Sequence, residues 1–125
     1  MNKFELKDKE LTGRIIQEFY ETYNKLGFGF DQGVYKNSYS SIMRNWGLEV
    51  EFDKEIDVMF GVEKVGTYKL DFVVEQKIIL LITSSNEIET HELKRLYNFL
   101  KMSPYKTGLL LNFGIKPEHK RRDIL

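Results

Sequence analysis

Cysteine is absent from the 125 residues, and proline occurs only twice. Without cysteine the chain can form no disulfide framework, no thiol nucleophile and no cysteine-ligated zinc or iron–sulfur site. The hydrophobic share of 42% argues against disorder, because it supplies enough apolar surface to build a core. The length predicts one compact domain over residues 1–125.

Long apolar runs and an excess of one charge are also lacking. The longest apolar run, residues 78–82, is far shorter than the roughly 20 residues that a membrane span needs. Residues 1–7 are charged too early for a signal peptide. Lys and Arg total 19 and Asp and Glu total 19, so any contact with nucleic acid must come from a local patch. We expect a cytoplasmic protein that makes no membrane contact.

Apolar residues at helical spacing predict two helices in the first part of the chain. The first covers residues 8–25 behind an extension of residues 1–7, with Asp8 as its N-cap and Gly27 as its stop. The second covers residues 32–47. Their expected buried stripes consist of Leu11, Ile15, Ile16, Phe19, Tyr23, Leu26, Tyr35, Tyr39, Ile42, Met43 and Trp46.

From residue 48 the apolar residues alternate with polar ones, which is typical of strands. This period predicts strands over residues 48–53, 56–60 and 67–74. Gly61 and Gly66 suit a hairpin turn between the last two, because glycine accepts positive φ.

The last third of the chain predicts two buried strands around a helix. Residues 78–83, apolar through residue 82, favour a strand covered on both faces, and residues 108–113 favour another. Asn86 and Glu89 can form a capping box for the helix between them. With 48–53 and 56–60 as separate strands, the order is α-α-β-β-β-β-α-β, an α/β fold with helices on a mixed sheet.

Three patterns that suggest chemistry have simpler explanations. The glycine-rich residues 27–33 follow a helix and lack Gly-Lys-Ser/Thr, so they predict a helix stop and turn rather than a phosphate loop. His91 and His119 have no neighbouring ligands at metal-binding spacing. The basic cluster within residues 116–125 can grip phosphates, but it lacks interleaved aromatics, which favours a solvated polar tail.

Asp71 is the most informative carboxylate. It lies within a predicted strand whose other face is wholly apolar, and an unpaired charge there is costly. Lys69 shares its face and can neutralise it. The functional alternative is a divalent-metal ligand, because Mg²⁺ is often held by one or two carboxylates.

Several short sequence blocks occur along the chain in an order that is typical of one protein family. They are Leu11-Thr12-Gly13, Ile15-Ile16, Glu21, Leu26-Gly27, Gly29, Val34-Tyr35, Gly47-Leu48, Asp71, Gly108-Leu109-Leu110 and Asn112-Phe113. Together they resemble the GxxExxY family of the PD-(D/E)xK, or restriction-endonuclease-like, superfamily. The resemblance runs from residue 11 to about residue 121 and implies a restriction-endonuclease-like core.

The resemblance also implies a metal-dependent active site, which this sequence matches in part. Such a site uses an acid of the first helix, a strand Asp and a Glu-x-Lys on the next strand. Glu21 and Asp71 stand at the first two positions, as metal ligands if the domain is active.

The departures from the family pattern fall on its chemistry. Leu81 and Thr83 replace the Glu and Lys, and Gln32 replaces the Glu of the family's name motif. A helix-one His becomes Tyr23, and a helix-three Gln becomes Arg95. A scaffold kept without its metal ligands and lysine is the pattern of an inactive homologue.

Relocated residues offer one route by which activity survives. Lys69 can replace the missing cation, and Asp31, Glu87, Glu89 or Glu92 can supply a displaced carboxylate. We favour loss of activity, because the missing carboxylate and lysine together remove several kcal/mol of transition-state stabilisation.

The leading functional hypothesis is an inactive nuclease-like domain that binds nucleic acid or protein, with no cofactor. Alternatives are a divergent Mg²⁺- or Mn²⁺-dependent nuclease using Glu21 and Asp71, and a purely structural homo-oligomer such as a homodimer. The residues expected to contact DNA or RNA are Lys36, Arg44, Lys94, Arg95, Lys120 and Arg121.

Overall fold

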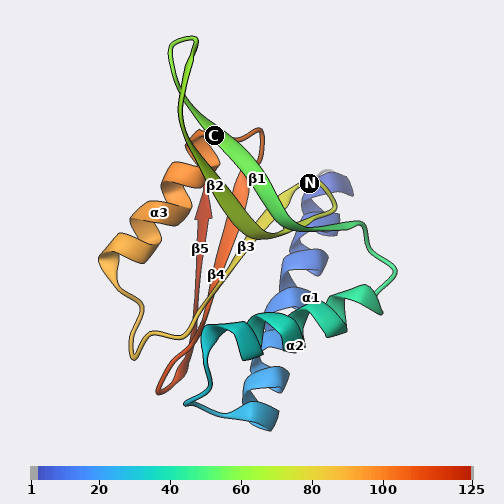
Figure 1. The fold of residues 1–125 in the computed structure, drawn as a ribbon. Coiled ribbons are helices and arrows are strands. Elements are labelled where there is room, and N and C mark those ends of the chain that lie inside the picture. Colours follow the sequence, from blue (N-terminus) through green and yellow to red (C-terminus); the bar gives the residue numbers. More distant parts are fainter. Residues whose placement is uncertain (1–2, 125) are drawn as a thin grey trace.

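The computed structural model describes residues 3–124, with side chains from residue 9 onward. Its elements are α1 (Lys3–Leu26), α2 (Gln32–Arg44), β1 (Val50–Phe60), β2 (Glu63–Val74), β3 (Ile78–Thr83), α3 (Thr90–Lys101), β4 (Thr107–Phe113) and β5 (Pro117–Asp123). A five-stranded sheet in the order β1-β2-β3-β4-β5 has α1 and α2 on one face and α3 on the other (Figure 1). The predicted α/β class with a mixed sheet is confirmed.

The strand directions explain the position of α3. β3 and β4 run parallel, whereas β1 with β2, β2 with β3, and β4 with β5 are antiparallel. Parallel neighbours need a crossover connection, and α3 provides it. β1 and β2 form a long hairpin that extends beyond the rest of the sheet (Figure 1).

β3 is the centre of the core, and all its residues are buried. Ile78, Leu80 and Ile82 pack on the α1–α2 side, while Ile79 and Leu81 pack on the α3 side. Each such side chain contributes about 1.5–3 kcal/mol of burial free energy. The prediction of a strand covered on both faces is therefore confirmed.

Aromatic residues attach α2 to its neighbours. Tyr35 stacks on Phe113 of β4 with ring centroids 4.3 Å apart. The Tyr39 hydroxyl donates a hydrogen bond of 2.6 Å to the Ile15 carbonyl of α1. These contacts fix the face of α2 that points toward the sheet.

Two predictions about strands were wrong. Residues 48–53 and 56–60 contribute to one strand, β1, which continues through Asp53 at a φ of 51°. Phe52 packs on the α1–α2 side and Ile56 on the α3 side, so the strand rotates at Asp53 and the alternation breaks there.

The polar tail predicted over 116–125 contains β5, which pairs with β4 from Pro117 to Asp123. Charged residues are common on edge strands because they oppose pairing with other chains. A strand of this kind has no hydrophobic period to reveal it in the sequence.

Several predicted ends were also wrong. α1 begins at Lys3, so most of the predicted extension 1–7 is helical and Asp8 is no N-cap, whereas residues 1–2 lie outside the described residues. The hairpin turn is shorter than predicted, because β2 already begins at Glu63. α2 ends at Arg44 rather than at residue 47.

The cap of α3 also differs from the prediction. Glu89 precedes the helix, and its N–H donates a hydrogen bond of 2.9 Å to the Glu92 carboxylate. The capping box therefore lies three residues after the predicted Asn86–Glu89 pair.

Across residues 3–124, no helix is both long enough and apolar enough to cross a membrane.

Candidate functional site

The site is built where β2 and β3 separate. Their pairing extends from Val74↔Ile78 only to Phe72↔Leu80. Beyond it, Oδ2 of Asp71 accepts a hydrogen bond of 2.8 Å from the Ile82 N–H. A side-chain carboxylate thus continues the ladder in place of the backbone, and Asp71 is held at the point of divergence.

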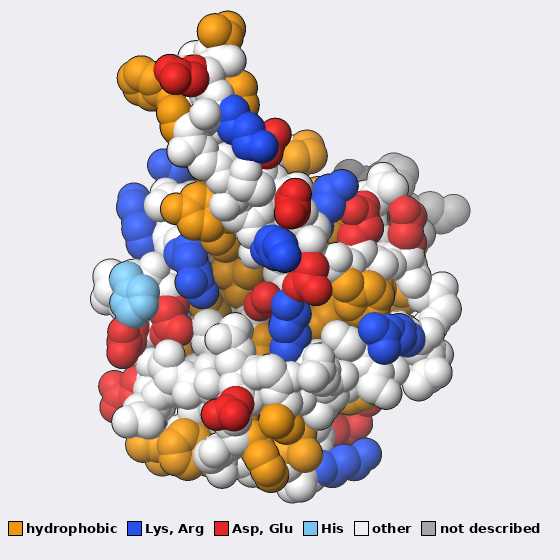
Figure 2. Space-filling view, in the orientation of Figure 1, with side chains coloured by type: hydrophobic (Ala, Val, Ile, Leu, Met, Phe, Trp, Pro, Cys, Tyr) orange, Lys and Arg blue, Asp and Glu red, His pale blue; other side chains and the backbone are white. Residues whose placement is uncertain are grey.

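Lys36 of α2 joins Asp71 to a second acid, Asp53. The Lys36 Nζ contacts Oδ1 of Asp53 and lies 3.4 Å from Oδ1 of Asp71. Asp53 stands across β1 and β2 from Asp71, between the pairs Phe52↔Phe72 and Lys54↔Leu70. Figure 2 shows acidic and basic side chains gathered at the middle of the face turned toward the viewer, below the β1–β2 hairpin.

The electrostatics of this cluster favour its charged form. Burial lowers the pKa of Lys36, but the hydrogen bond to Asp53 and the charges of Asp71 and Asp53 outweigh burial and raise it. The hydrogen bond from Lys36 lowers the pKa of Asp53. The side chain of Asp71 is 17% exposed and that of Asp53 is 52% exposed, so water reaches the cluster from the Asp53 side.

Gln32, which the resemblance aligns with the Glu of the family's name motif, has a structural role. Its Nε2 donates a hydrogen bond of 2.6 Å to the Ile82 carbonyl. Side chains therefore hold both sides of Ile82, Asp71 at its N–H and Gln32 at its C=O. An ionised Glu has no proton to donate at this point.

The two strand positions that would carry the Glu and Lys face other surroundings. Leu81 is buried in the core on the α3 side. The Thr83 hydroxyl donates a hydrogen bond of 2.8 Å to Oδ1 of buried Asn112. Asn112 also accepts from the Ser85 N–H and donates to the Ser85 carbonyl, so Thr83 belongs to a network that fixes the loop after β3.

Among the described side chains, the other sequence candidates, Glu21 and Lys69, form no hydrogen bond or ion pair with Asp71. Glu21 accepts a hydrogen bond from Gln17 within α1 and lines a groove between α1 and α2 with Ser38 and Ser41. Lys69 is exposed on β2 and pairs in register with Glu55, and its charge contributes to lowering the pKa of Asp53. The cation that contacts Asp71 comes from Lys36 instead.

Two of the four carboxylates predicted as replacements, Glu92 and Glu89, have other contacts. Glu92 is buried and accepts a hydrogen bond of 2.9 Å from the Ser85 hydroxyl. Glu89 lies 3.0 Å from Nδ1 of exposed His91. The second acid beside Asp71 is Asp53, which the sequence reasoning missed. The broken alternation at residues 53–55 was the signal that could have marked it.

A divalent ion does not fit these residues as they stand. Within residues 9–124, whose side chains the structure describes, no group of three or more His, Asp or Glu could hold a metal. Oδ1 of Asp53 and Oδ1 of Asp71 are both engaged by Lys36. A metal would therefore have to displace the ammonium group.

Among the residues predicted to contact nucleic acid, Lys94 and Arg95 share one groove beside α3. The Arg44 guanidinium lies over the Phe52 ring at 5.1 Å. On β5, Nε of Arg121 is 2.8 Å from Asp123. The six predicted residues thus do not form one cluster.

The fold and the acid at the divergence of two central strands define a restriction-endonuclease-like domain. The model of the PD-(D/E)XK nuclease superfamily matches residues 9–123, and the chain belongs to this superfamily. The crystal structure of SSO0001 is similar, with a TM-score of 0.58 and 15% identity over 73% of this chain and 48% of that chain. This chain thus spans about half the length of that structure, and the likeness shows the fold alone. A search of curated proteins found no match.

Proposed function

We propose that this chain is a nuclease-fold domain of the GxxExxY type that has lost hydrolytic activity and serves as a nucleic-acid-binding module. The observation that supports the loss of activity is the position of the Lys36 ammonium, in contact with both Asp53 and Asp71. Carboxylates of such a site are the natural ligands of Mg²⁺ or Mn²⁺. Here an internal cation takes that position.

Replacing Lys36 with a metal ion is unfavourable. The Lys36 side chain is 27% exposed, so removing its partners leaves a largely desolvated charge. Asp71 already accepts one hydrogen bond from the backbone at its other oxygen. Lys36 balances one of the two negative charges, while the Ile82 N–H and the water that reaches half-exposed Asp53 stabilise the other.

The transition state would also lack a cation at the family's lysine position. Phosphodiester hydrolysis builds negative charge that a lysine or metal must stabilise. Thr83 is neutral and hydrogen-bonded to Asn112, and Lys36 is already balanced by two acids. The described groups therefore support the binding of a substrate better than its cleavage.

The matched residues of the GxxExxY motif support a scaffold role. Gly29 adopts a φ of 116°, a conformation that is strongly unfavourable for any residue with a Cβ atom. The Tyr35 hydroxyl donates to the Gly27 carbonyl at 2.6 Å and accepts from the Phe30 N–H at 3.1 Å. Glycine and tyrosine thus shape the loop between α1 and α2 without any catalytic group.

The binding role rests on a local excess of positive charge. Between Leu93 and Lys101, α3 carries three basic residues and no acidic one, in a chain that is neutral overall. Phosphate contacts from such a patch provide affinity without sequence recognition.

The test is a cleavage and binding assay on plasmid, duplex and single-stranded DNA with Mg²⁺ or Mn²⁺. We expect no cleavage above the level of Asp71→Asn, together with salt-sensitive retention of DNA. Glu21→Gln is the matched control, because it removes a carboxylate from the α1–α2 groove. Metal-dependent cleavage that Asp71→Asn abolishes would overturn the loss of activity, and absence of retention would overturn the binding role.

A divergent nuclease is the second candidate function. It is favoured by Asp53 and Lys36, which place a second carboxylate and an ammonium beside Asp71. These are the residue types missing at positions 81 and 83. This candidate predicts cleavage that is lost in Asp53→Asn and in Asp71→Asn.

A further inference from the structure

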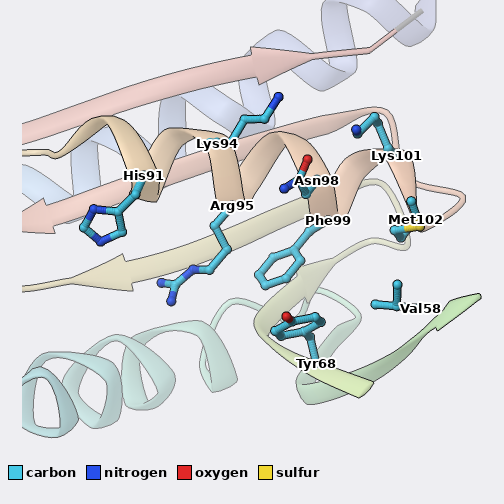
Figure 3. A pocket seen from close by; sticks show the side chains of 9 residues that line it. All are labelled: Val58, Tyr68, His91, Lys94, Arg95, Asn98, Phe99, Lys101 and Met102. Carbon is cyan, nitrogen blue, oxygen red and sulfur yellow. The ribbon is translucent and has the colours of Figure 1, made fainter. Parts of the chain in front are cut away.

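A groove with a basic wall and an aromatic floor lies between α3 and the β1–β2 hairpin. It encloses about 490 Å³, within the range of sites that bind small organic ligands. Figure 3 shows Arg95 and Phe99 pointing from α3 toward Tyr68 of the hairpin, whereas Lys94 and Lys101 point from α3 to the side away from Tyr68. The residues that matter here are Tyr68, Lys94, Arg95, Asn98, Phe99 and Lys101.

The floor of the groove presents an open aromatic ring. Tyr68 is 52% exposed, and one side of it lies against Phe99 with ring centroids 5.4 Å apart. Phe99 is itself buried and therefore holds Tyr68 in place. A large exposed ring supported from below is a stacking platform, since a flat ligand can cover its free surface.

The wall of the groove is positively charged. Lys94, Arg95 and Lys101 line it, and Asn98 adds a neutral hydrogen-bonding group between them. No acidic side chain is among the described residues that line it. Lys94 and Lys101 are seven residues apart on α3, which separates them by about 10 Å along the helix axis. Their ammonium groups both lie over the Tyr97 ring, each 5.4 Å from its centroid, so the positive charge extends from Arg95 beside the platform around α3 to Lys94 and Lys101.

We propose that this groove binds single-stranded nucleic acid, with one base stacked on Tyr68, the nearest phosphate on Arg95 and the following phosphates on Lys94 and Lys101 around α3. The inference rests on the proposed nucleic-acid-binding function and specifies the form of the ligand. A paired base keeps both of its surfaces stacked within a duplex, so an open tyrosine ring selects an unpaired base. An acidic polypeptide would satisfy the cations but would leave the ring without a stacking partner.

The salt dependence follows from the number of cations. Three phosphate contacts with a single strand predict a slope of about −2 in log K against log[salt]. Replacing Lys94 or Lys101 with Gln should reduce the magnitude of this slope by about 0.7 for each residue.

The experiment is fluorescence anisotropy with a labelled oligothymidine and with a duplex of the same length. We expect the single strand to bind more tightly than the duplex, and Tyr68→Ala to weaken it about 10-fold. Tyr68→Phe should keep the affinity, because the stacking surface remains. Lys25→Gln, which removes a charge from the end of α1, is the matched control for the lysine variants.

Several results would overturn the inference. They are equal or tighter duplex binding, full affinity in folded Tyr68→Ala, or a loss of affinity in Lys120→Gln that exceeds the loss in Lys94→Gln. Displacement of the oligonucleotide by polyglutamate at matched ionic strength would favour an acidic polypeptide instead. If any of these results is obtained while duplex DNA is still bound, the single-strand inference fails but the proposed nucleic-acid-binding function stands. If no nucleic acid binds, both the inference and the proposed function are overturned.

Discussion

Replacing Lys36 with methionine tests whether its ammonium takes the place of a metal ion. Methionine retains much of the length and apolar volume of the lysine side chain but carries no charge. The substitution leaves Asp53 and Asp71 facing each other without the cation that both contact. Their mutual repulsion should make the variant less stable and receptive to a divalent ion.

The expected loss of stability lies between two limits. Exposed ion pairs are worth about 0–1 kcal/mol, whereas removing one partner of a fully buried pair costs about 3–5 kcal/mol. Asp71 is mostly buried, but Asp53 is half exposed and solvent screens its charge. We therefore expect a loss of about 2 kcal/mol, which corresponds to a fall in Tm of about 8 °C at this chain length.

Manganese should restore much of this loss. A ligand present at 100 times its Kd stabilises the folded state by about 2.7 kcal/mol. Thermal unfolding and calorimetric titration with Mn²⁺ should therefore show binding to Lys36→Met and little binding to the wild type. Lys25→Met is the matched control and should behave like the wild type.

An equal response of Lys36→Met and the wild type to Mn²⁺ would refute the reasoning.

The pH dependence of stability is an independent check. Because the pKa of Asp53 is lowered by folding, its contribution to the stability of the folded state is fully present above pH 3.8, the ordinary pKa. That contribution is lost as pH falls through the lower pKa of the folded state. Because the pKa of Lys36 is raised by folding, its contribution to stability is complete below pH 10.5, the ordinary pKa. That contribution is lost as pH rises through the higher pKa of the folded state. The stability gap between wild type and Lys36→Met should therefore stay constant from about pH 5 to 9 and narrow outside that window.

Three further predictions concern the scaffold. Gln32→Glu removes the donor to the Ile82 carbonyl, so it should cost about 1–3 kcal/mol in chemical denaturation without creating cleavage, while Gln17→Glu on the α1 surface should cost little. Gly114→Ala would place a Cβ 2.4 Å from a backbone carbonyl oxygen, so its Tm should fall by more than that of Gly108→Ala, which meets only a leucine side chain. Burial lowers the pKa of His119, and the charge of a neighbouring lysine lowers it further. As pH falls, His119 therefore becomes protonated in the unfolded chain before it does in the folded protein, so the free energy of unfolding should decrease below pH 6.5. A His119→Gln variant should lose this part of the pH dependence. If its pH profile of stability matches that of the wild type, the assignment to His119 is contradicted.

Local patterns carried the prediction of the main elements. The apolar spacing of α1 and α2 correctly placed Ile15, Phe19, Tyr35 and Tyr39 in the core. The continuous apolar run of β3 correctly indicated a strand covered on both faces. These features follow from periodicities of 3.6 and 2 residues, which a chain expresses without reference to distant segments.

The ends of elements depended on information that such patterns lack. Residues 3–7 are helical in α1, yet the apolar spacing from which the helix is predicted begins only at Leu11, so the sequence predicts an extension there. β5 forms because its backbone pairs with β4, and its charged side chains give no apolar period. Pairing partners far apart in the chain are set by the sheet and not by the local composition.

The sequence alone determined the class of fold, the buried faces and the importance of Asp71, because each depends on residue type and short-range spacing. Only the tertiary structure decided what surrounds Asp71. Lys36, Asp53 and Asp71 come from three elements and meet because β2 and β3 diverge beneath α2. The groove beside α3 arises in the same way, since the hairpin brings Tyr68 against Phe99 across 31 residues of chain. Charges and rings separated in this way interact through space, and no local period records that proximity.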